Sequence, residues 1–349
     1  MKNNKGFIGI GIIIAIIAVL IVGGLGYYKS KIKTEPIDVE ENNLLEKEQQ
    51  EENILEETTE DTSNKQTEIN YIKVDNNNAV VLANNKFTFD IYPKLAAEDG
   101  NIFFSPLSIS SAFGMVYEGA NGETASEIKS VFNFPSDINV IRNSFASINN
   151  EINKDSNEYK LSIANALWVQ KDYKFLESFI SSVGQYYDVK ATNVDFKNKV
   201  EDARQAINKW VEDKTNNKIK NILPINSLSK GTKLVLTNAI YFNGKWDKPF
   251  LKNGTKSGIN FFTDSENSVE VNMMQEENND GTVFNYAEND SLQILEMPYK
   301  GKQLSIIVLL PKKNDISSFE KLLTLSNFNN WKKELKEQRV NVFIPQFKF

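Results

Sequence analysis

Apolar residues recur at helical spacing in the first half of the folded region. Phe87, Ile91 and Leu95 are four residues apart, which predicts a helix that begins near residue 84. A second helix is predicted from Pro106, because Ser105 is a favourable N-cap and proline is favoured at the first helical position. Further helices are predicted over 124–132, 175–187 and 203–211. This half of the chain is therefore expected to be mainly helical.

The second half has the pattern of strands. Residues 234–242 are apolar at nearly every position, which indicates a strand covered on both faces. Strand-like runs follow at 258–262, 268–274, 282–286, 292–297, 304–310 and 340–349, interrupted by one helix near 319–336. Helices followed by strands predict an α+β fold with large, mainly antiparallel sheets. The last run is an apolar strand without a closing turn, so we expect the sequence to be incomplete at that end.

The N-terminal segment is apolar enough to span a membrane. After a short flank at 1–5, Gly6 to Tyr27 are 22 uncharged residues, rich in Ile, and as a helix they would cross a bilayer core of about 30 Å. We expect residues 6–28 to be a transmembrane helix or signal anchor. A cleaved signal peptide is the alternative, although its apolar core is usually only about 7–15 residues long. Flanking lysines do not decide the orientation.

The expected anchor also predicts the cellular location of the protein. Lys5-Gly6-Phe7 before an Ile-rich run resembles the leader of type IV pilins, but Gly11 stands where that family has a glutamate. We therefore expect a prokaryotic envelope protein and not a pilus subunit. The predicted location is the cell membrane, with a single pass and an extracytoplasmic, extracellular globular domain.

Charge divides the rest of the chain into a linker and a domain. Residues 35–68 carry a net charge of −11 and residues 1–34 a net charge of +5, so the total of −6 leaves residues 69–349 neutral. Residues 29–80 are expected to be an acidic, disordered linker, with an acidic docking tail as the minor alternative. The globular domain is expected over 81–349. A neutral domain argues against a nucleic-acid partner.

The amino-acid composition excludes several common classes of catalytic and metal site. The chain has no Cys and no His, which excludes disulfides, thiolate nucleophiles, Cys or His zinc sites and the Ser-His-Asp triad. Ser126 and Lys129 fit an SxxK hydrolase motif, but its KTG companion is absent and Thr124 to Glu127 also form a capping box. We expect no catalytic residue, metal or cofactor. An envelope hydrolase using Ser126 and Lys129 stays open as a distant alternative.

Longer strings along the chain resemble the serpin family in the order that this family has them. They are 101–112 (NIFFSPLSISSA), 117–124 (YEGANGET), 207–223, 236–250 (LTNAIYFNGKWDKPF), 271–274 (VNMM), 296–299 (EMPY), 309–311 (LLP) and 343–347 (FIPQF). The resemblance covers about residues 81–349. It implies a serpin fold, cut off before the reactive loop, whose residues are therefore unknown.

The resemblance also implies which residues control the main sheet. The positions that match Ser105, Ser108 and Asn238 form the family's shutter, a hydrogen-bonded cluster beneath the place where the sheet opens. Trp246 matches the breach at the top of that sheet. The alternatives are an ordinary N-cap at Ser105, a satisfied core amide at Asn238 and an ordinary core aromatic at Trp246, because a buried amide needs partners in any fold.

A serpin-type function is mechanical and not enzymatic. The resemblance implies a suicide substrate: a serine or cysteine protease cuts the reactive loop, and the loop inserts into the main sheet as a new strand and distorts the bound protease. The nucleophile then belongs to the protease, which agrees with a chain that lacks His and Cys. A non-inhibitory binding protein with the serpin fold is the alternative.

Overall fold

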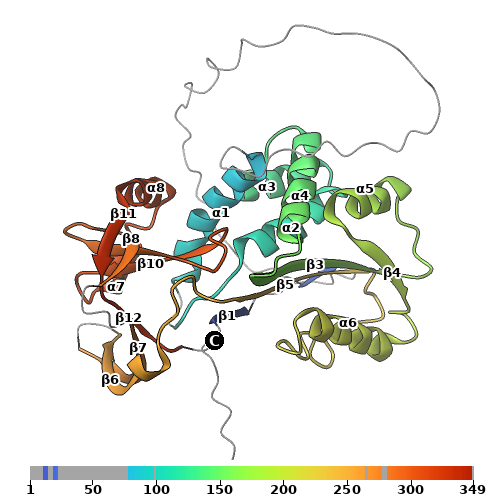
Figure 1. Ribbon diagram of the computed structural model, residues 1–349. Coiled ribbons are helices and arrows are strands. Elements are labelled where there is room, and N and C mark those ends of the chain that lie inside the picture. The colour runs from blue at the N-terminus through green and yellow to red at the C-terminus, as the bar shows by residue number, and fades with distance from the viewer. Residues whose placement is uncertain are drawn as a thin grey trace, which may run out of the picture. The chain divides into compact units, whose positions relative to one another are not determined.

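The computed structural model describes residues 11–14, 19–22, 78–97, 100–263, 266–276 and 281–347 (Figure 1). The helices are α1 (Ala79–Leu95), α2 (Pro106–Tyr117), α3 (Gly122–Phe132), α4 (Ile138–Ile152), α5 (Glu177–Tyr187), α6 (Val200–Lys214), α7 (Ile316–Glu320) and α8 (Leu325–Glu334). The strands are β1 (Gly11–Ile14), β2 (Val19–Val22), β3 (Tyr159–Gln170), β4 (Lys190–Val194), β5 (Leu234–Gly244), β6 (Lys256–Phe262), β7 (Ser268–Glu276), β8 (Thr282–Glu288), β9 (Leu292–Pro298), β10 (Ser305–Pro311), β11 (Lys336–Val340) and β12 (Val342–Pro345).

Three sheets carry the described strands. The five-stranded sheet has the order β1-β5-β3-β4, and β2 pairs with β5 as well. The other two sheets have the orders β10-β9-β8-β11 and β12-β7-β6. Every described pair is antiparallel except β3 with β4, which is parallel. The predicted α+β fold with mainly antiparallel sheets is confirmed.

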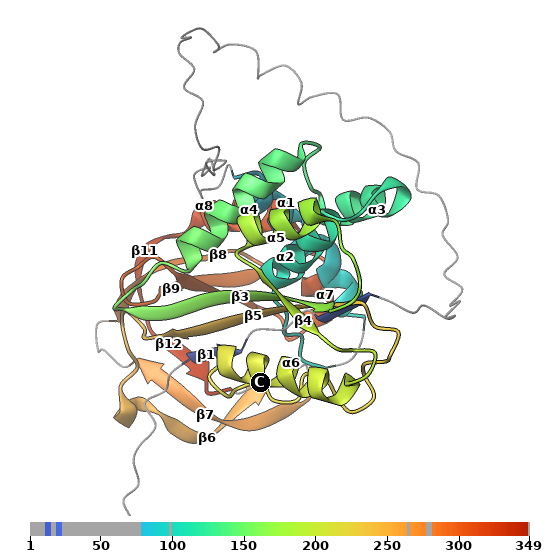
Figure 2. The same ribbon diagram turned by 90° about the vertical axis from the view of Figure 1, so that its right-hand side faces the viewer.

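Helices cover both faces of β3 and β5. In both views α2, α4 and α5 lie above these strands and α6 lies below them (Figures 1 and 2). Successive strand residues point to opposite faces, so Leu234 and Leu236 belong to the core under α1–α5, whereas Val235 belongs to the core with α6. Burial on two faces explains why β5 is apolar at successive positions.

Aromatic rings fill the core of the upper layer. Phe132 at the end of α3 lies 4.5 Å from Phe87 and 4.6 Å from Phe113, measured between ring centroids. Phe145 of α4 contacts Tyr187 of α5 with centroids 5.0 Å apart. These contacts involve residues of five helices over the sheet, α1 to α5, and each buried ring of this size stabilises the fold substantially.

Several elements differ from the sequence expectation. α3 begins at Gly122 after the N-cap Asn121, so Thr124 and Glu127 lie inside the helix and are not its capping box. Two short helices, α7 and α8, replace the single helix expected near 319–336. β3 was not predicted, because Ser162 and Asn165 interrupt its apolar run and its residues show no regular alternation.

The N-terminal segment also differs. Two short pieces of 6–28 are described, and they are the strands β1 and β2, so the expected transmembrane helix is not shown and stays a prediction. Among the described residues, no helix has the length and apolar character needed to cross a bilayer. Ile and Val favour strands, and the edge of β5 offers backbone groups for pairing. The rest of 6–28 and residues 29–77 lie outside the described part of the chain.

In the described structure the folded domain begins at α1. Asn78 caps this helix by accepting hydrogen bonds from the backbone N–H groups of Val80 and Val81, at 3.1 and 3.2 Å. Val80 is fully buried. The helix therefore starts just before residue 81, where we placed the domain boundary, and the expected division into anchor, linker and domain stays a prediction.

Candidate functional site

The middle of β5 carries a buried amide. Asn238 is 0% exposed and points to the face covered by α1–α5, because Leu234 and Leu236 belong to that face and the strand has a period of two. Its side-chain Nδ2 donates a 2.6 Å hydrogen bond to Asn165 Oδ1. Asn165 lies directly opposite on β3. This largely apolar strand therefore has two polar side-chain bonds to β3: this one, and the one that Trp168 Nε1 donates to Thr237 Oγ1 at 3.1 Å.

The bridge continues into the helical layer. Asn165 Nδ2 donates to the backbone carbonyl of Tyr187, the last residue of α5, at 3.2 Å. A space of about 320 Å³ adjoins this bridge, and Asn165 and Tyr187 both line it. Burial, followed by the nearby charge of Glu118, raises the pKa of Tyr187 well above its usual value. Sequence reasoning missed Asn165, although an amide inside the apolar run of β3 is the same signal that marked Asn238.

Ser105 and Ser108 lie at the start of α2, and this helix packs on β5. Ser105 Oγ accepts a 3.3 Å hydrogen bond from the backbone N–H of Ser108, so the predicted N-cap is confirmed. Ser108 Oγ, Ser111 Oγ and Asn238 Oδ1 are all buried and have no hydrogen-bond partner among the described residues. The structure therefore brings the helix and the strand together without a hydrogen bond between Ser108 and Asn238.

Buried polar groups of this kind are costly. A buried polar atom without a partner costs about 1–3 kcal/mol, and three of them belong to the two elements that meet here. Native proteins rarely keep such atoms without a reason. The cluster holds acceptors and rotatable hydroxyl donors, which a polar group from another segment can satisfy.

The end of β5 is packed differently. Trp246 stacks on Tyr299 with centroids 4.4 Å apart and planes 13° apart, and their backbones form a β-bridge. Tyr299 also meets Phe242 edge-on at 4.7 Å. Burial raises the pKa of Tyr299 to about 12. A Cβ atom at Gly244 would lie 2.7 Å from Phe242 Cζ, so this position needs glycine for close approach.

Ser126 and Lys129 do not have the arrangement that the hydrolase alternative needs. Ser126 Oγ donates a 3.1 Å hydrogen bond to the carbonyl of Gly122, one turn earlier in α3. Lys129 Nζ donates instead to Ser136 Oγ at 2.8 Å. The two side chains that would form a nucleophile and its base therefore bind other groups. Among the described residues, no cluster of three carboxylates could hold a metal ion.

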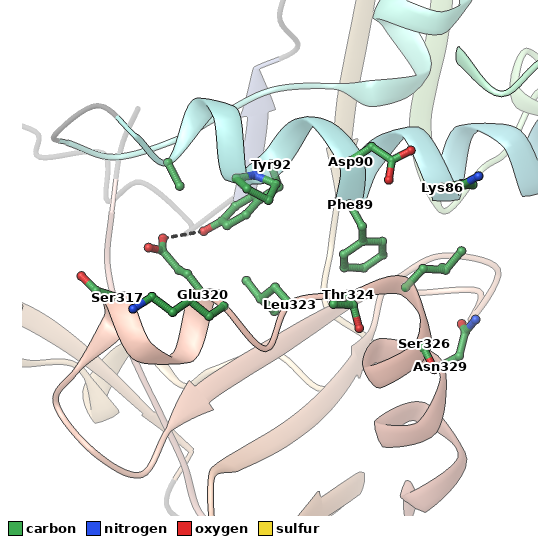
Figure 3. A pocket seen from close by; sticks show the side chains of 14 residues that line it. Lys86, Phe89, Asp90, Tyr92, Ser317, Glu320, Leu323, Thr324, Ser326 and Asn329 are labelled. Atoms are coloured by element: carbon green, nitrogen blue, oxygen red, sulfur yellow. Dashed lines mark hydrogen bonds between the residues drawn. The ribbon is translucent and has the colours of Figure 1, made fainter. Parts of the chain in front are cut away.

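A larger cavity, of about 790 Å³, lies between α1 and the α7–α8 segment (Figure 3). The Tyr92 hydroxyl donates to Glu320 Oε1 at 2.8 Å across it, from a position 228 residues away in sequence. Burial, and then Glu320, raise the pKa of Tyr92 to about 12. Phe89 and Leu323 extend into the space from opposite walls (Figure 3). The residues that line this cavity come from segments more than 200 positions apart, so no local sequence pattern predicts the cavity.

Comparison with known proteins decides the family. The family model described as "Serpin (serine protease inhibitor)" matches residues 82–349. The chain belongs to the serpin family. An uncharacterised serpin-like protein of Methanosarcina acetivorans is 42% identical over 277 residues, which are 77% of this chain and 64% of that protein. This serpin therefore spans less than two thirds of the length of that archaeal relative.

Two further serpins support the assignment. Leukocyte elastase inhibitor of the horse (Equus caballus) is 38% identical over 275 residues, covering 76% of this chain and 72% of that protein. The structure of ovalbumin from the emu (Dromaius novaehollandiae) matches with a TM-score of 0.71 at 30% identity, covering 76% of this chain and 73% of the other. Serpins are mostly protease inhibitors and not enzymes. The shutter role of Ser105, Ser108 and Asn238 and the breach role of Trp246 stay predictions.

Proposed function

We propose that this serpin inhibits serine or cysteine proteases by inserting a cleaved reactive loop beside β5. The observation that carries the proposal is that buried polar atoms of Asn238, Ser108 and Ser111 have no hydrogen-bond partner among the described residues, on a strand and a helix that pack against each other. A strand that enters the sheet here gains backbone hydrogen bonds, and a rearranged cluster gains the partners that it now lacks. The native state therefore holds free energy that insertion releases.

The target class rests on the family and on relatives. The horse relative is named as an inhibitor of leukocyte elastase, and the family model is described as a serine protease inhibitor. This chain spans 64% of the Methanosarcina protein, so the activity of the whole inhibitor, its targets and its loop insertion all belong to the proposal.

Covalent trapping is the decisive test. The protein expressed from its full reading frame is incubated with elastase, trypsin, chymotrypsin, subtilisin and papain. We expect an SDS-stable complex with at least one protease, at the summed mass of the inhibitor and the protease less the C-terminal peptide that cleavage of the loop releases. Serine proteases first inactivated with phenylmethylsulfonyl fluoride are the matched control and form no complex, since the acyl bond needs the active serine. Cleavage without a complex by all five proteases would favour a non-inhibitory binding protein.

We also propose that residues 6–28 anchor this serpin in the cell membrane, with the inhibitory domain outside the cytoplasm. The support is the run of 22 uncharged residues followed by an acidic segment of net charge −11. We expect the full chain to sediment with membranes after carbonate washing, and added protease to digest its domain in intact spheroplasts. A chain without residues 1–28 is the control and is released. Recovery of the full chain in the soluble fraction would contradict the anchor.

A further inference from the structure

Three loops meet at one end of the five-stranded sheet. β3 and β4 both end there, because they are parallel, and β5 begins there, because it is antiparallel to β3. The backbone N–H of Gln170, the last residue of β3, donates to the carbonyl of Lys233 at 2.9 Å. The N–H of Lys171 donates to the carbonyl of Val194 at 3.0 Å. These bonds hold three loop segments side by side, namely 171–176, 195–199 and 230–233.

Lysines without a carboxylate partner gather on these loops. Lys174, Lys197 and Lys199 are exposed, and none of them forms an ion pair within the described part of the chain. Lys233 has no carboxylate partner there either, and its Nζ lies 5.7 Å from the centre of the Tyr173 ring. We refer to these four lysines, together with Tyr173 and Leu176, as the basic face.

Most carboxylates of the same loops are engaged within the fold. Asp195 Oδ2 lies 2.9 Å from Lys171 Nζ, and Asp195 Oδ1 accepts from the backbone N–H of Asn198 at 2.9 Å. Asp172 accepts a hydrogen bond from the side chain of Gln170. Glu177 is exposed in the first turn of α5, where the helix dipole favours an acid. The lysines of the basic face are therefore the charges that stay available to a partner.

Apolar side chains stand beside these cations. Tyr173 is 49% exposed and Leu176 is 74% exposed. The Tyr173 ring is held in place by an edge-on contact with Phe175, with centroids 4.9 Å apart. Exposed apolar side chains next to lysines are typical of protein surfaces that rest on a membrane, where the apolar groups enter the lipid and the cations meet its headgroups.

We propose that the basic face docks this domain onto an anionic membrane surface. The lysine ammonium groups meet lipid phosphates, and each such cation strengthens binding to an anionic surface about five-fold. Tyr173 lies at the headgroup level, which suits a ring with a polar hydroxyl, and Leu176 enters the acyl boundary. A polyanion in solution has no apolar region for Leu176, so an anionic lipid surface is the partner that matches both kinds of side chain.

A fluorophore at residue 176 tests whether this face meets lipid. The chain has no cysteine of its own, so Leu176→Cys carries a single NBD group, an apolar dye whose emission rises in lipid. The full chain is purified in mild detergent, labelled, and mixed with vesicles as the detergent is removed. One set of vesicles is phosphatidylcholine alone, and the other is equal parts of phosphatidylcholine and phosphatidylglycerol.

We expect emission from residue 176 to be at least about two-fold higher with the phosphatidylglycerol vesicles. Val131→Cys, at a 55% exposed position of α3, is the matched control label and should not respond. An apolar anchor enters both lipids, so the difference between them reports the basic face whether or not residues 6–28 insert. Equal emission from residue 176 in the two lipids, or an equal rise at residue 131, would overturn the proposal.

Charge reversal tests the lysines. The variant Lys174→Glu/Lys197→Glu/Lys199→Glu, in the chain labelled at residue 176, should lose the response to phosphatidylglycerol. If it does not melt like the parent chain, the three corresponding glutamine substitutions replace it. A response that survives in the folded variant would overturn the role of these lysines.

A second triple variant controls for net charge. Lys313→Glu/Lys321→Glu/Lys336→Glu makes the same change at exposed lysines outside the basic face, and it should keep the response. Loss of the response in both triple variants would mean that overall charge and not this face binds the lipid. Inorganic polyphosphate without lipid should leave the dye unchanged; a rise equal to that with vesicles would assign the face to soluble polyanions instead. No protease enters the readout, so the result is independent of inhibition.

Discussion

The middle and the end of β5 are built in opposite ways. At the middle, Asn238 is fully buried, with one hydrogen bond and one unpaired oxygen. At the end, Trp246, Tyr299 and Phe242 form a continuous aromatic stack. The first arrangement leaves polar groups without partners, and the second leaves no space even for a Cβ atom at Gly244.

The difference indicates which part of the sheet changes and which part holds. Unpaired buried atoms raise the free energy of the native state, so a rearrangement that pairs them is favourable. Stacked rings gain their stabilisation in the present geometry and lose it when they separate. We therefore expect the centre of β5 to be responsive and its end to be rigid.

Removing a ring from the end should have the largest effect. Tyr299 is 3% exposed and contacts both Trp246 and Phe242. We expect Tyr299→Ala to lower the free energy of unfolding by about 3–5 kcal/mol, the usual cost of deleting a buried ring. Urea unfolding measures it. Tyr299→Phe keeps the stack and should cost less than about 1 kcal/mol; equal losses in the two variants would contradict the packing role.

Removing the polar bridge should have the next largest effect. Asn165→Ala leaves Asn238 Nδ2 without its acceptor and the Tyr187 carbonyl without its donor. We expect a loss of about 1–3 kcal/mol in urea unfolding. Lys160→Ala, at an exposed position of the same strand, should stay within about 0.5 kcal/mol. An unchanged stability of Asn165→Ala would mean that the bridge contributes nothing.

The two serines of α2 should respond in opposite directions. Ser105 caps the helix, so Ser105→Ala should lower the free energy of unfolding by about 1 kcal/mol. The hydroxyl of Ser108 is buried and has no hydrogen-bond partner in the described part of the chain, so Ser108→Ala should leave stability unchanged or raise it by up to about 1 kcal/mol. Thermal melts compare the two variants directly. A larger loss from Ser108→Ala than from Ser105→Ala would reverse our account of the cluster.

The smallest effect is expected at alkaline pH. Burial raises the pKa of Tyr299 to about 12, above its unfolded value near 10. The neutral phenol is favoured in the fold, so its contribution is complete below pH 10 and is lost as the pH rises towards 12. Between pH 9 and 10.5 we expect Tyr299 to account for a loss under about 1 kcal/mol. Tyr299→Phe should show a shallower decline; parallel curves would refute this assignment.

Much of the fold follows from local sequence pattern. The spacing of Phe87, Ile91 and Leu95 predicted α1, and the Ser105-Pro106 pair predicted the start of α2. The apolar run at 234–242 predicted β5. These elements were predictable because their signals lie within a few residues along the chain.

Other parts depend on distant contacts. Asn165 became a site residue only because strand register places it opposite Asn238. The cavity between α1 and α7–α8 has walls that meet only in the folded chain. The pairing of the short strands β1 and β2 with β5 likewise joins segments more than 200 residues apart, which no local pattern indicates.

The sequence by itself determined the α+β class, the family resemblance, the absence of His and Cys chemistry, and the candidates Ser105, Ser108, Asn238 and Trp246. Tertiary structure alone decided that Asn238 bonds to Asn165, that the Ser108 hydroxyl has no hydrogen-bond partner among the described residues, and that Trp246 stacks on Tyr299. The physical reason is that hydrogen-bond satisfaction and ring packing depend on distances between segments far apart in sequence, whereas periodicity and caps depend on neighbours.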